Sequence, residues 1–398
     1  MTSTDEDIQP YPFGPAERLD LHPHYARLRD EEPVAKVRLP FGSWAWLVTR
    51  HEDVKLVMAD PRFRRTTPED TDTPRATESY PASRDSFLTA TGAEHLRLRK
   101  LVARAFSVPR IEKLRPRAQS TVDGLLDDLL RQGRPADLAG GLAWLLPVTM
   151  ICELLGADVA DRDRFAAWAI RMQGVHGLEE MDLARAELGA YFADLVARRR
   201  KAPADDLVSV LITAREGEKL TEAELISLCM VLLVGGFEST ANQISNSIYA
   251  LLARPELWEQ LVDNPELAPR AVEELLRFLP LIRVTTFPVM AAEDVDMDGV
   301  LIRAGDAVVT APYSANRDPA VFARPEEIDL GRTENPHLTF SHGAHHCLGA
   351  PLARMELQVV IGTLARRLPS LRLAIPAGEV AWSEDSLLRT VETLPVTW

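Results

Sequence analysis

The segment from Thr221 to Arg254 limits the possible folds of this chain most, because it predicts one very long helix. Thr221 and Glu224 have the spacing of a capping box at a helix start, and Pro255 marks the end. At about 1.5 Å per residue this helix would be roughly 50 Å long, enough to cross the whole molecule. Its most apolar part, Leu225 to Phe237, is interrupted by a serine and two glycines and is shorter than the ~20 residues of a membrane span. We therefore expect a central helix inside a globular protein.

Helical patterns dominate the chain from about residue 94 to 280, and strand patterns are few. Residues 34–49 predict two strands joined by a turn, and residues 295–311 predict a small hairpin system. A last helix is expected over Leu348–Leu368, and the proline-rich segment 66–86 predicts a long irregular loop. The sequence shows no internal repeat and no clean domain boundary. We therefore expect a single domain over residues 1–398, mainly α with minor β.

Charge and cysteine usage indicate where such a protein works. Acidic residues number 59 and basic residues 45, which gives a net charge of −14 and no general attraction to nucleic acid or anionic lipid. The N-terminal segment is polar and acidic, unlike a signal peptide or a membrane anchor. The three cysteines (Cys152, Cys229 and Cys347) fit an intracellular protein without disulfides, and the first two lie in apolar helices typical of the core. We expect a monomeric cytoplasmic protein.

The chemistry is concentrated between Phe340 and Gly349, where histidines precede a cysteine. Two interpretations are open. His342, His345, His346 and Cys347 could bind zinc, although zinc ligands are usually spaced more widely and this cluster has no second half elsewhere. Alternatively, Cys347 is a lone thiolate at a helix start, where free N–H groups lower the thiol pKa and the sulfur can bind haem iron.

The glycines of this segment fit the second interpretation. Gly343 permits a tight turn before the cysteine. Gly349 has no side chain to hold the following helix away from a flat cofactor.

Two further pairs of polar side chains have helical spacing, and a third pair consists of adjacent residues in the long helix. Glu274 and Arg277 share a helix face in apolar surroundings, which predicts a buried ion pair. His95 and Arg99 also share a face and could hold two carboxylates, although an ordinary basic surface helix would show the same spacing. In the long helix, a glycine pair precedes Glu238 and Ser239, where a bend could form; alternatively, Ser239 bonds to the carbonyl group four residues back.

Together these motifs resemble the cytochrome P450 family. The segment 340–349 matches its haem-binding loop, Phe-x-x-Gly-x-His-x-Cys-x-Gly. The resemblance implies haem b (iron protoporphyrin IX), with Cys347 as iron ligand, His345 at a propionate and Phe340 shielding the sulfur. It places the long helix over the haem, adds Arg332 to the buried pair, and assigns His95 and Arg99 to the propionates. It also assigns Glu238 and Ser239 to proton relay. The remaining cofactor-binding residues it implies are those that contact the haem in the loop: Gly343 and Gly349.

The sequence departs from the family pattern at three positions. Ser239 stands where threonine is usual, and Phe237 stands where histidine is frequent, which would make the pocket more apolar. Val289 replaces an arginine that usually binds a propionate, and Arg283 is the candidate that we consider as its substitute.

The resemblance implies a monooxygenase that uses O2 and receives electrons from a ferredoxin and its reductase, because no dinucleotide-binding motif is present. Between His95 and Arg117, eight basic residues accompany one acid, which predicts a docking face for an acidic ferredoxin or, alternatively, a solvated helix face.

The expected substrate is an uncharged, mostly hydrophobic small molecule of secondary metabolism, such as a polyketide or macrolide in antibiotic biosynthesis. The resemblance predicts its pocket from residues 66–92, Phe165–Met181, Phe237, 284–287 and Leu387–Leu388. A non-catalytic haem sensor or carrier is the alternative function, and the proton-relay pair Glu238 and Ser239 argues against it.

Overall fold

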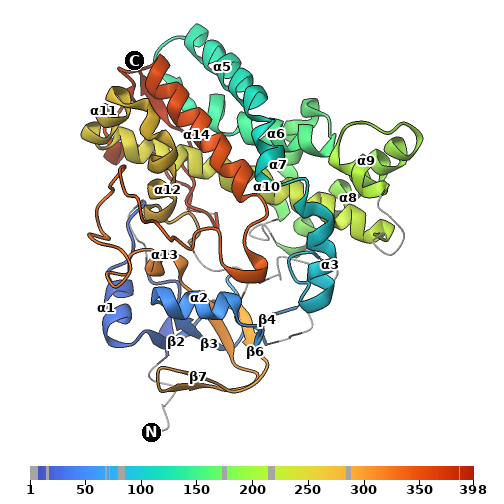
Figure 1. The fold of residues 1–398 in the computed structure, drawn as a ribbon, viewed down its shortest axis with the longest axis vertical. Coiled ribbons are helices and arrows are strands. Elements are labelled where there is room, and N and C mark those ends of the chain that lie inside the picture. Colours follow the sequence, from blue (N-terminus) through green and yellow to red (C-terminus); the bar gives the residue numbers. More distant parts are fainter. Residues whose placement is uncertain are drawn as a thin grey trace.

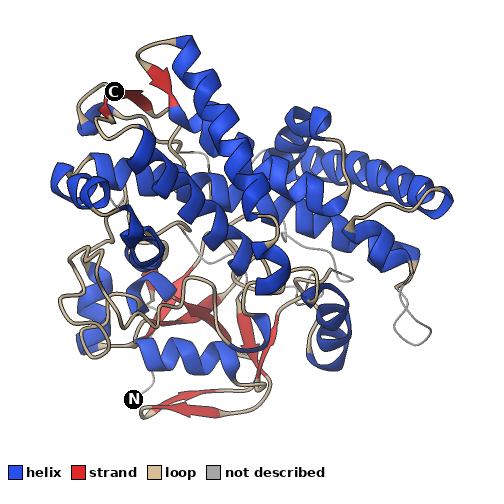
Figure 2. Cartoon of the chain, turned by 45° about the horizontal axis from the view of Figure 1, so that its top comes forward, coloured by secondary structure: helices blue, strands red, loops and turns tan. Residues whose placement is uncertain are grey.

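The computed structural model describes residues 8–14, 18–67, 70, 72–78, 86–172, 177–213, 220–283, 288–384 and 386–398. Helices fill most of the molecule, and the largest sheet lies at one end beside α2 (Figure 1). Figure 2 shows the same division, with a second small group of strands near the C-terminus. The fold is therefore mainly helical with small sheets, as the sequence predicted.

The α-helices account for nearly half of the described residues. They are α1 (His24–Glu31), α2 (His51–Ala59), α3 (Gly92–Ala103), α4 (Val108–Glu112), α5 (Arg115–Gln132), α6 (Leu145–Leu155), α7 (Arg162–Met172), α8 (Leu178–Lys201), α9 (Leu207–Ile212), α10 (Glu222–Leu252), α11 (Pro255–Asp263), α12 (Ala268–Phe278), α13 (Pro312–Ala315) and α14 (Ala350–Arg367). The predicted last helix is thus confirmed as α14.

The strands form three sheets. The six-stranded sheet has the order β1 (Gln9–Pro10), β2 (Val34–Arg38), β3 (Trp44–Val48), β9 (Ala307–Thr310), β6 (Val289–Ala291), β4 (Phe63–Arg65). The three-stranded sheet contains β10 (Arg372–Leu373), β11 (Pro395–Thr397) and β5 (Ala136–Asp137), and the hairpin pairs β7 (Val295–Met297) with β8 (Val300–Ile302).

Two strand predictions can be compared with this topology. The pair expected over 34–49 is confirmed as β2 and β3, which are antiparallel. The hairpin expected over 295–311 is confirmed only as far as β8, with Asp298 and Gly299 both at positive φ in its turn. The last part of that segment, β9, pairs with β3 and β6 in the large sheet instead. Alternating hydrophobicity predicts a strand but does not identify its partner.

Helix α10 is the predicted central helix. Its capping box is formed, with the Thr221 hydroxyl accepting from the N–H of Glu224 and the Glu224 carboxylate accepting from the N–H of Thr221. It packs against α6, α8 and α14. Among the described residues, α10 alone has the length and apolarity of a membrane-spanning helix, and half of its most apolar stretch is buried inside the molecule. Such burial is also found in the core helix of a soluble protein.

The predicted ion pair of α12 is fully buried and has the expected third partner. Arg277 donates to both carboxylate oxygens of Glu274, at 2.8 and 2.9 Å, and both side chains are 0% exposed. Arg332 donates to the same carboxylate at 2.9 Å. Arg277 also donates to the carbonyl oxygens of Asn316, Pro325 and Glu327. This one guanidinium therefore fixes the irregular segment that leads to Cys347.

We expect Glu274→Gln to destabilise the protein strongly, because it leaves two buried guanidinium groups without their anion. Breaking a buried pair costs about 3–5 kcal/mol. The control is Glu327→Gln, which removes an exposed ion pair with Arg324 and should change the free energy of unfolding by at most about 1 kcal/mol. Urea unfolding followed by circular dichroism measures both, and equal losses would contradict the importance of the buried pair.

Candidate functional site

The loop that carries Cys347 is held against α2 by a close backbone approach. Gly343 begins a short 3-10 turn with φ of +70°. A Cβ atom there would lie 2.8 Å from Cα of Ala59 and 2.9 Å from the carbonyl oxygen of Met58, so only glycine fits. The N–H of Cys347 donates to the carbonyl oxygen of Phe340 at 2.8 Å and closes the loop. The tight turn expected at Gly343 is therefore present.

The pKa of the Cys347 thiol is raised in the structure, whereas the sequence predicted that it would be lowered. The side chain is accessible, yet burial raises the pKa of its thiol, so it lies in a recess of the protein. Hydrogen bonds from the N–H groups of Gly349 and Ala350, and the charges of Arg99 and Arg354, lower the pKa but do not outweigh burial. The N–H groups at the helix start thus lower the thiol pKa as expected, but their effect is smaller than that of burial. A coordinated metal ion would deprotonate such a thiol.

Helix α3 brings His95 and Arg99 to this loop. The His95 ring stacks on the His345 ring, with centroids 4.1 Å apart. Arg99 donates to the carbonyl oxygen of His346 at 2.6 Å. Burial and nearby positive charge lower the pKa of His95 to about 4 and that of His345 to about 3, so both rings are neutral near pH 7. The structure thus brings together residues that lie about 250 positions apart.

Arg65, at the end of β4, is a residue of this site that the sequence analysis missed. Its charge contributes to lowering the pKa of both His95 and His345, which places it near both rings. It also lines a cavity of about 170 Å³ together with His345 and Val289. The only sequence signal for Arg65 is weak: two consecutive arginines precede the long loop, and the partner strand β6 is more than 220 residues away.

The donors around this cavity fit a carboxylate-bearing haem. Haem carries two propionate carboxylates, and the two neutral imidazole rings and the guanidinium groups of Arg65 and Arg99 are groups that can donate hydrogen bonds to them. Among the described residues, no three His, Cys, Asp or Glu side chains are placed to hold a metal ion. The zinc interpretation is therefore not supported by this part of the chain.

The glycine-containing segment of α10 is continuous helix. Ser239 donates to the carbonyl oxygen of Gly235 at 3.2 Å, so the local bond considered as its alternative role is present. Gly235 is exposed and Ser239 is half-buried on the same helix face, whereas Glu238 and Thr240 are buried. A Cβ atom on the next residue, Gly236, would lie 2.8 Å from Ile151 of α6, so this glycine allows close helix packing.

Two residues expected in the substrate pocket lie in the core instead. Phe237 is fully buried and packs edge-on against Trp144 at 6.0 Å, because its position on α10 faces neighbouring helices. Phe165 is also fully buried, against Trp168. Leu387 and Leu388 are half-buried, as a pocket wall would be. Residues 284–287, and parts of 66–92 and 165–181, lie outside the described residues.

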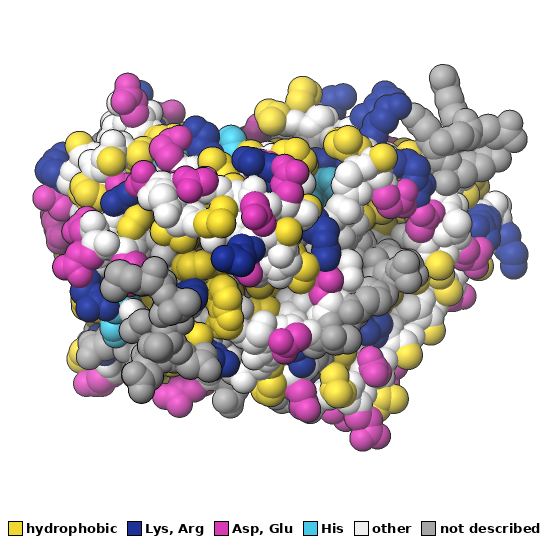
Figure 3. Space-filling model, turned by 90° about the horizontal axis from the view of Figure 1, so that it is seen from below, with side chains coloured by type: hydrophobic (Ala, Val, Ile, Leu, Met, Phe, Trp, Pro, Cys, Tyr) yellow, Lys and Arg dark blue, Asp and Glu magenta, His cyan; other side chains and the backbone are white. Residues whose placement is uncertain are grey.

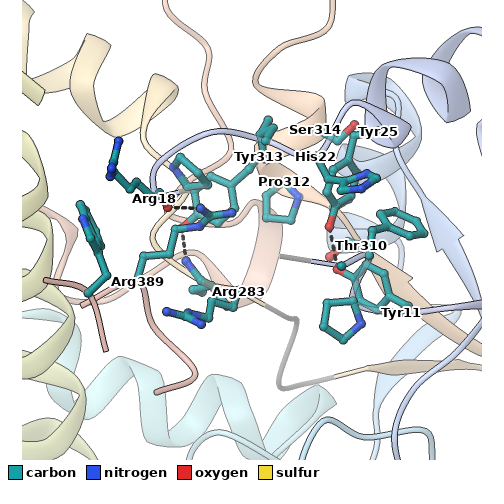
Figure 4. Close-up of a pocket in the computed structure, with 18 of the residues that line it drawn as sticks. Tyr11, Arg18, His22, Tyr25, Arg283, Thr310, Pro312, Tyr313, Ser314 and Arg389 are labelled. Carbon is teal, nitrogen blue, oxygen red and sulfur yellow. Dashed lines mark hydrogen bonds between the residues drawn. The ribbon is translucent and has the colours of Figure 1, made fainter. Parts of the chain in front are cut away.

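Arg283, the candidate substitute for the arginine missing at Val289, lines a larger cavity of about 440 Å³. Arg283 donates to the carbonyl oxygen of Ser383 and lies on one side of this cavity with Arg18 and Arg389 (Figure 4). It is not among the residues that line the smaller cavity around Val289. The described contacts of Arg283 therefore give no support to its proposed role as a substitute, which stays a prediction.

The basic segment 95–117 is less positive in the structure than in the sequence. Arg99 points to the loop of Cys347, Arg115 pairs with Glu112 at 2.6 Å, and Arg117 pairs with Glu153 at 2.5 Å. Arg104 and Lys113 remain exposed. Among the described side chains on the face seen from below, acidic and basic groups are intermingled (Figure 3).

Comparisons with known proteins identify the family. The cytochrome P450 family model matches residues 178–373. The chain is 51% identical to nocardicin C N-oxygenase of Nocardia uniformis subsp. tsuyamanensis, with all of both chains covered. It is 48% identical to mycinamicin IV hydroxylase/epoxidase of Micromonospora griseorubida, over 99% of this chain and 100% of the relative. The solved structure of cytochrome P450mel 107F1, which has biaryl coupling reactivity, superposes with a TM-score of 0.94 at 44% identity, covering 98% of this chain and 100% of that one.

The chain belongs to the cytochrome P450 family and is a cytochrome P450 monooxygenase. Membership of this family implies a haem cofactor, a small-molecule substrate and O2. The alternative of a non-catalytic haem sensor or carrier does not agree with these relatives, whose names are those of oxygenases and hydroxylases.

Proposed function

We propose that this chain is a haem-thiolate monooxygenase that binds haem b through Cys347 and oxidises a mostly hydrophobic natural product. The observation that carries the proposal is the convergence of Cys347 with His95, Arg99 and His345 on one recess. A thiol with cationic and N–H donors nearby suits a flat cofactor that has iron at its centre and carboxylates at its edge. Bound haem supplies the activation of O2 for insertion of one oxygen atom.

Residues of the Cys347 loop and of α3 would hold the cofactor. Cys347 provides the sulfur ligand, and Phe340 lies under Arg354, whose guanidinium is 4.6 Å from the ring centroid. Gly349 leaves space beside the sulfur, since an added Cβ would meet only Cys347 Sγ, at 3.9 Å. His95, Arg99 and His345 would donate to the propionates, and their neutral or positive state matches that role.

Glu238 and Ser239 would deliver the protons that the reaction consumes. One oxygen atom of O2 enters the substrate and the other leaves as water, which requires two electrons and two protons. The half-buried Ser239 hydroxyl lies on the accessible side of α10, and the adjacent Glu238 carboxyl is buried in the helix bundle. A hydroxyl both donates and accepts a proton, so Ser239 can pass protons from Glu238 toward the recess.

The relatives support the class of substrate. They act on nocardicin C or on mycinamicin IV, and their names include N-oxygenation, hydroxylation and epoxidation. We infer that this chain modifies a related natural product by hydroxylation or epoxidation in antibiotic biosynthesis.

As a cytoplasmic monomer, it would receive electrons from a ferredoxin and its reductase. Arg104 and Lys113 are exposed directly after α3 and α4; α3 contacts the Cys347 loop through Arg99, and α4 packs against α14, which supports a docking face there.

We expect Cys347→Ala to lose the long-wavelength Soret band that reduced haem-thiolate proteins show with carbon monoxide, because the other two cysteines, Cys152 and Cys229, are buried in α6 and α10. The control is Cys229→Ala, which removes a thiol buried in α10 and should keep the band. Circular dichroism establishes that both variants are folded. A parent-like spectrum from Cys347→Ala would disprove the ligand assignment.

We expect Ser239→Ala to release more hydrogen peroxide per electron pair, because the hydroxyl that passes protons is lost. Ser239→Thr should keep or improve product yield, since the added methyl group restricts the rotamer. Thr240→Ala is the matched control: positions 239 and 240 point about 100° apart, and Thr240 is buried. Uncoupling by Thr240→Ala alone would show that the proton path uses Thr240 instead.

We expect Arg104→Glu combined with Lys113→Glu to slow reduction by an acidic ferredoxin at low salt, by about tenfold or more. The difference should shrink as salt screens the charges, since the Debye length falls to about 8 Å at 0.15 M. Arg372→Glu, on the exposed strand β10, is the control. Stopped-flow reduction measures the rates, and equal slowing by the control would exclude this docking face.

A further inference from the structure

In the family pattern, an arginine that binds a haem propionate usually stands at the position of Val289. We propose that Arg65, on the neighbouring strand β4, binds that propionate in this chain. This inference rests on the proposed function, because it assigns a residue to the same cofactor. It concerns a residue that none of the motifs in the sequence contains.

The pairing of two strands carries the argument. β4 and β6 are antiparallel, and Arg65 lies directly opposite Val289 in their register. Directly opposite residues project to the same face of a sheet, with Cβ atoms about 4.5–5.5 Å apart. An arginine side chain is longer than this separation, so a guanidinium group attached at 65 can occupy the space that one attached at 289 would reach.

The cavity confirms that both side chains face one space. Arg65, Val289 and His345 all line the cavity of about 170 Å³ between the large sheet, α2 and the Cys347 loop. His345 in turn stacks on His95, with ring centroids 4.1 Å apart. Arg65 thus belongs to the same electrostatic cluster as the two histidines proposed to bind propionates.

The preceding arginine has a different role, which makes it a matched control. Successive residues of a strand point to opposite faces. Arg64 pairs with Asp70, with Nη2 2.9 Å from a carboxylate oxygen, and it is not among the residues that line this cavity. The two neighbouring arginines therefore have different surroundings, although they carry the same charge and lie on the same strand.

The experiment measures haem retention rather than turnover. Haem-loaded parent, Arg65→Ala, Arg64→Ala and the double variant Arg65→Ala with Val289→Arg are mixed with excess apomyoglobin, and the rate of haem transfer is followed by absorbance. A charge-assisted hydrogen bond to a carboxylate is lost in Arg65→Ala, so we expect haem transfer about ten- to a hundredfold faster. Arg64→Ala should stay within about twofold of the parent, because its charge does not face the haem.

The double variant tests whether an arginine at position 289 on β6 can replace Arg65 on β4. It should regain most of the parent's haem retention, because the guanidinium returns to the cavity from β6. Arg65→Ala that loses haem no faster than Arg64→Ala would overturn the inference, and so would a double variant that loses haem as fast as Arg65→Ala.

Two further measurements separate this inference from the proposed function. Arg65→Lys keeps the charge and should lose less haem than Arg65→Ala; equal loss by both would attribute the effect to packing and overturn the proposal. The carbon monoxide spectrum of the parent tests the Cys347 ligand independently. A parent with the haem-thiolate band and an Arg65→Ala variant with unchanged retention would refute only the role of Arg65.

Discussion

The buried carboxylate of Glu274 is the constraint on which the position of the Cys347 loop depends. It neutralises Arg277 and Arg332, and Arg277 in turn donates to three carbonyl oxygens of the irregular segment that follows α13. Asn316, within that segment, donates to the hydroxyl of Thr339 and accepts from the N–H of Leu338. A segment without regular secondary structure cannot satisfy its own backbone groups, so these side-chain contacts do so. The loop that reaches Cys347 is therefore rigid without being helical or extended.

The electrostatics of the recess complement a ligand that carries negative charge. The negative charge of Glu274 balances the positive charges of Arg277 and Arg332 inside the protein. Near Arg99, the lowered pKa values of His95 and His345 keep both rings neutral, which limits the positive charge there. The raised pKa of the Cys347 thiol follows from the same burial. Binding of an iron atom at the sulfur and of carboxylates at the donors would reverse both effects, so cofactor binding and stability are expected to be coupled.

The central helix combines strong packing with one accessible face. Its capping box and its apolar sequence are local features, and both predicted its extent closely. The roles of its middle residues were harder to predict: Phe237 packs against Trp144 in the core, while Ser239 bonds to Gly235 on the accessible side. A helix buried on nearly all sides has no hydrophobic periodicity that distinguishes a core residue from a pocket residue. The family pattern gave the register of Glu238 and Ser239, and the structure gave their surroundings.

The sequence by itself determined the helical fold class, the extent of α10, the buried Glu274–Arg277 pair and the glycine turn at Gly343. Each depends on residues close together in the chain, whose spacing fixes which side chains share a face. Only the tertiary structure decided that Arg65 faces Val289, that β9 leaves the hairpin for the large sheet, and that burial outweighs the helix start at Cys347. Strand partners and burial depend on contacts between distant segments, and local sequence patterns carry no information about which distant segment will be the neighbour.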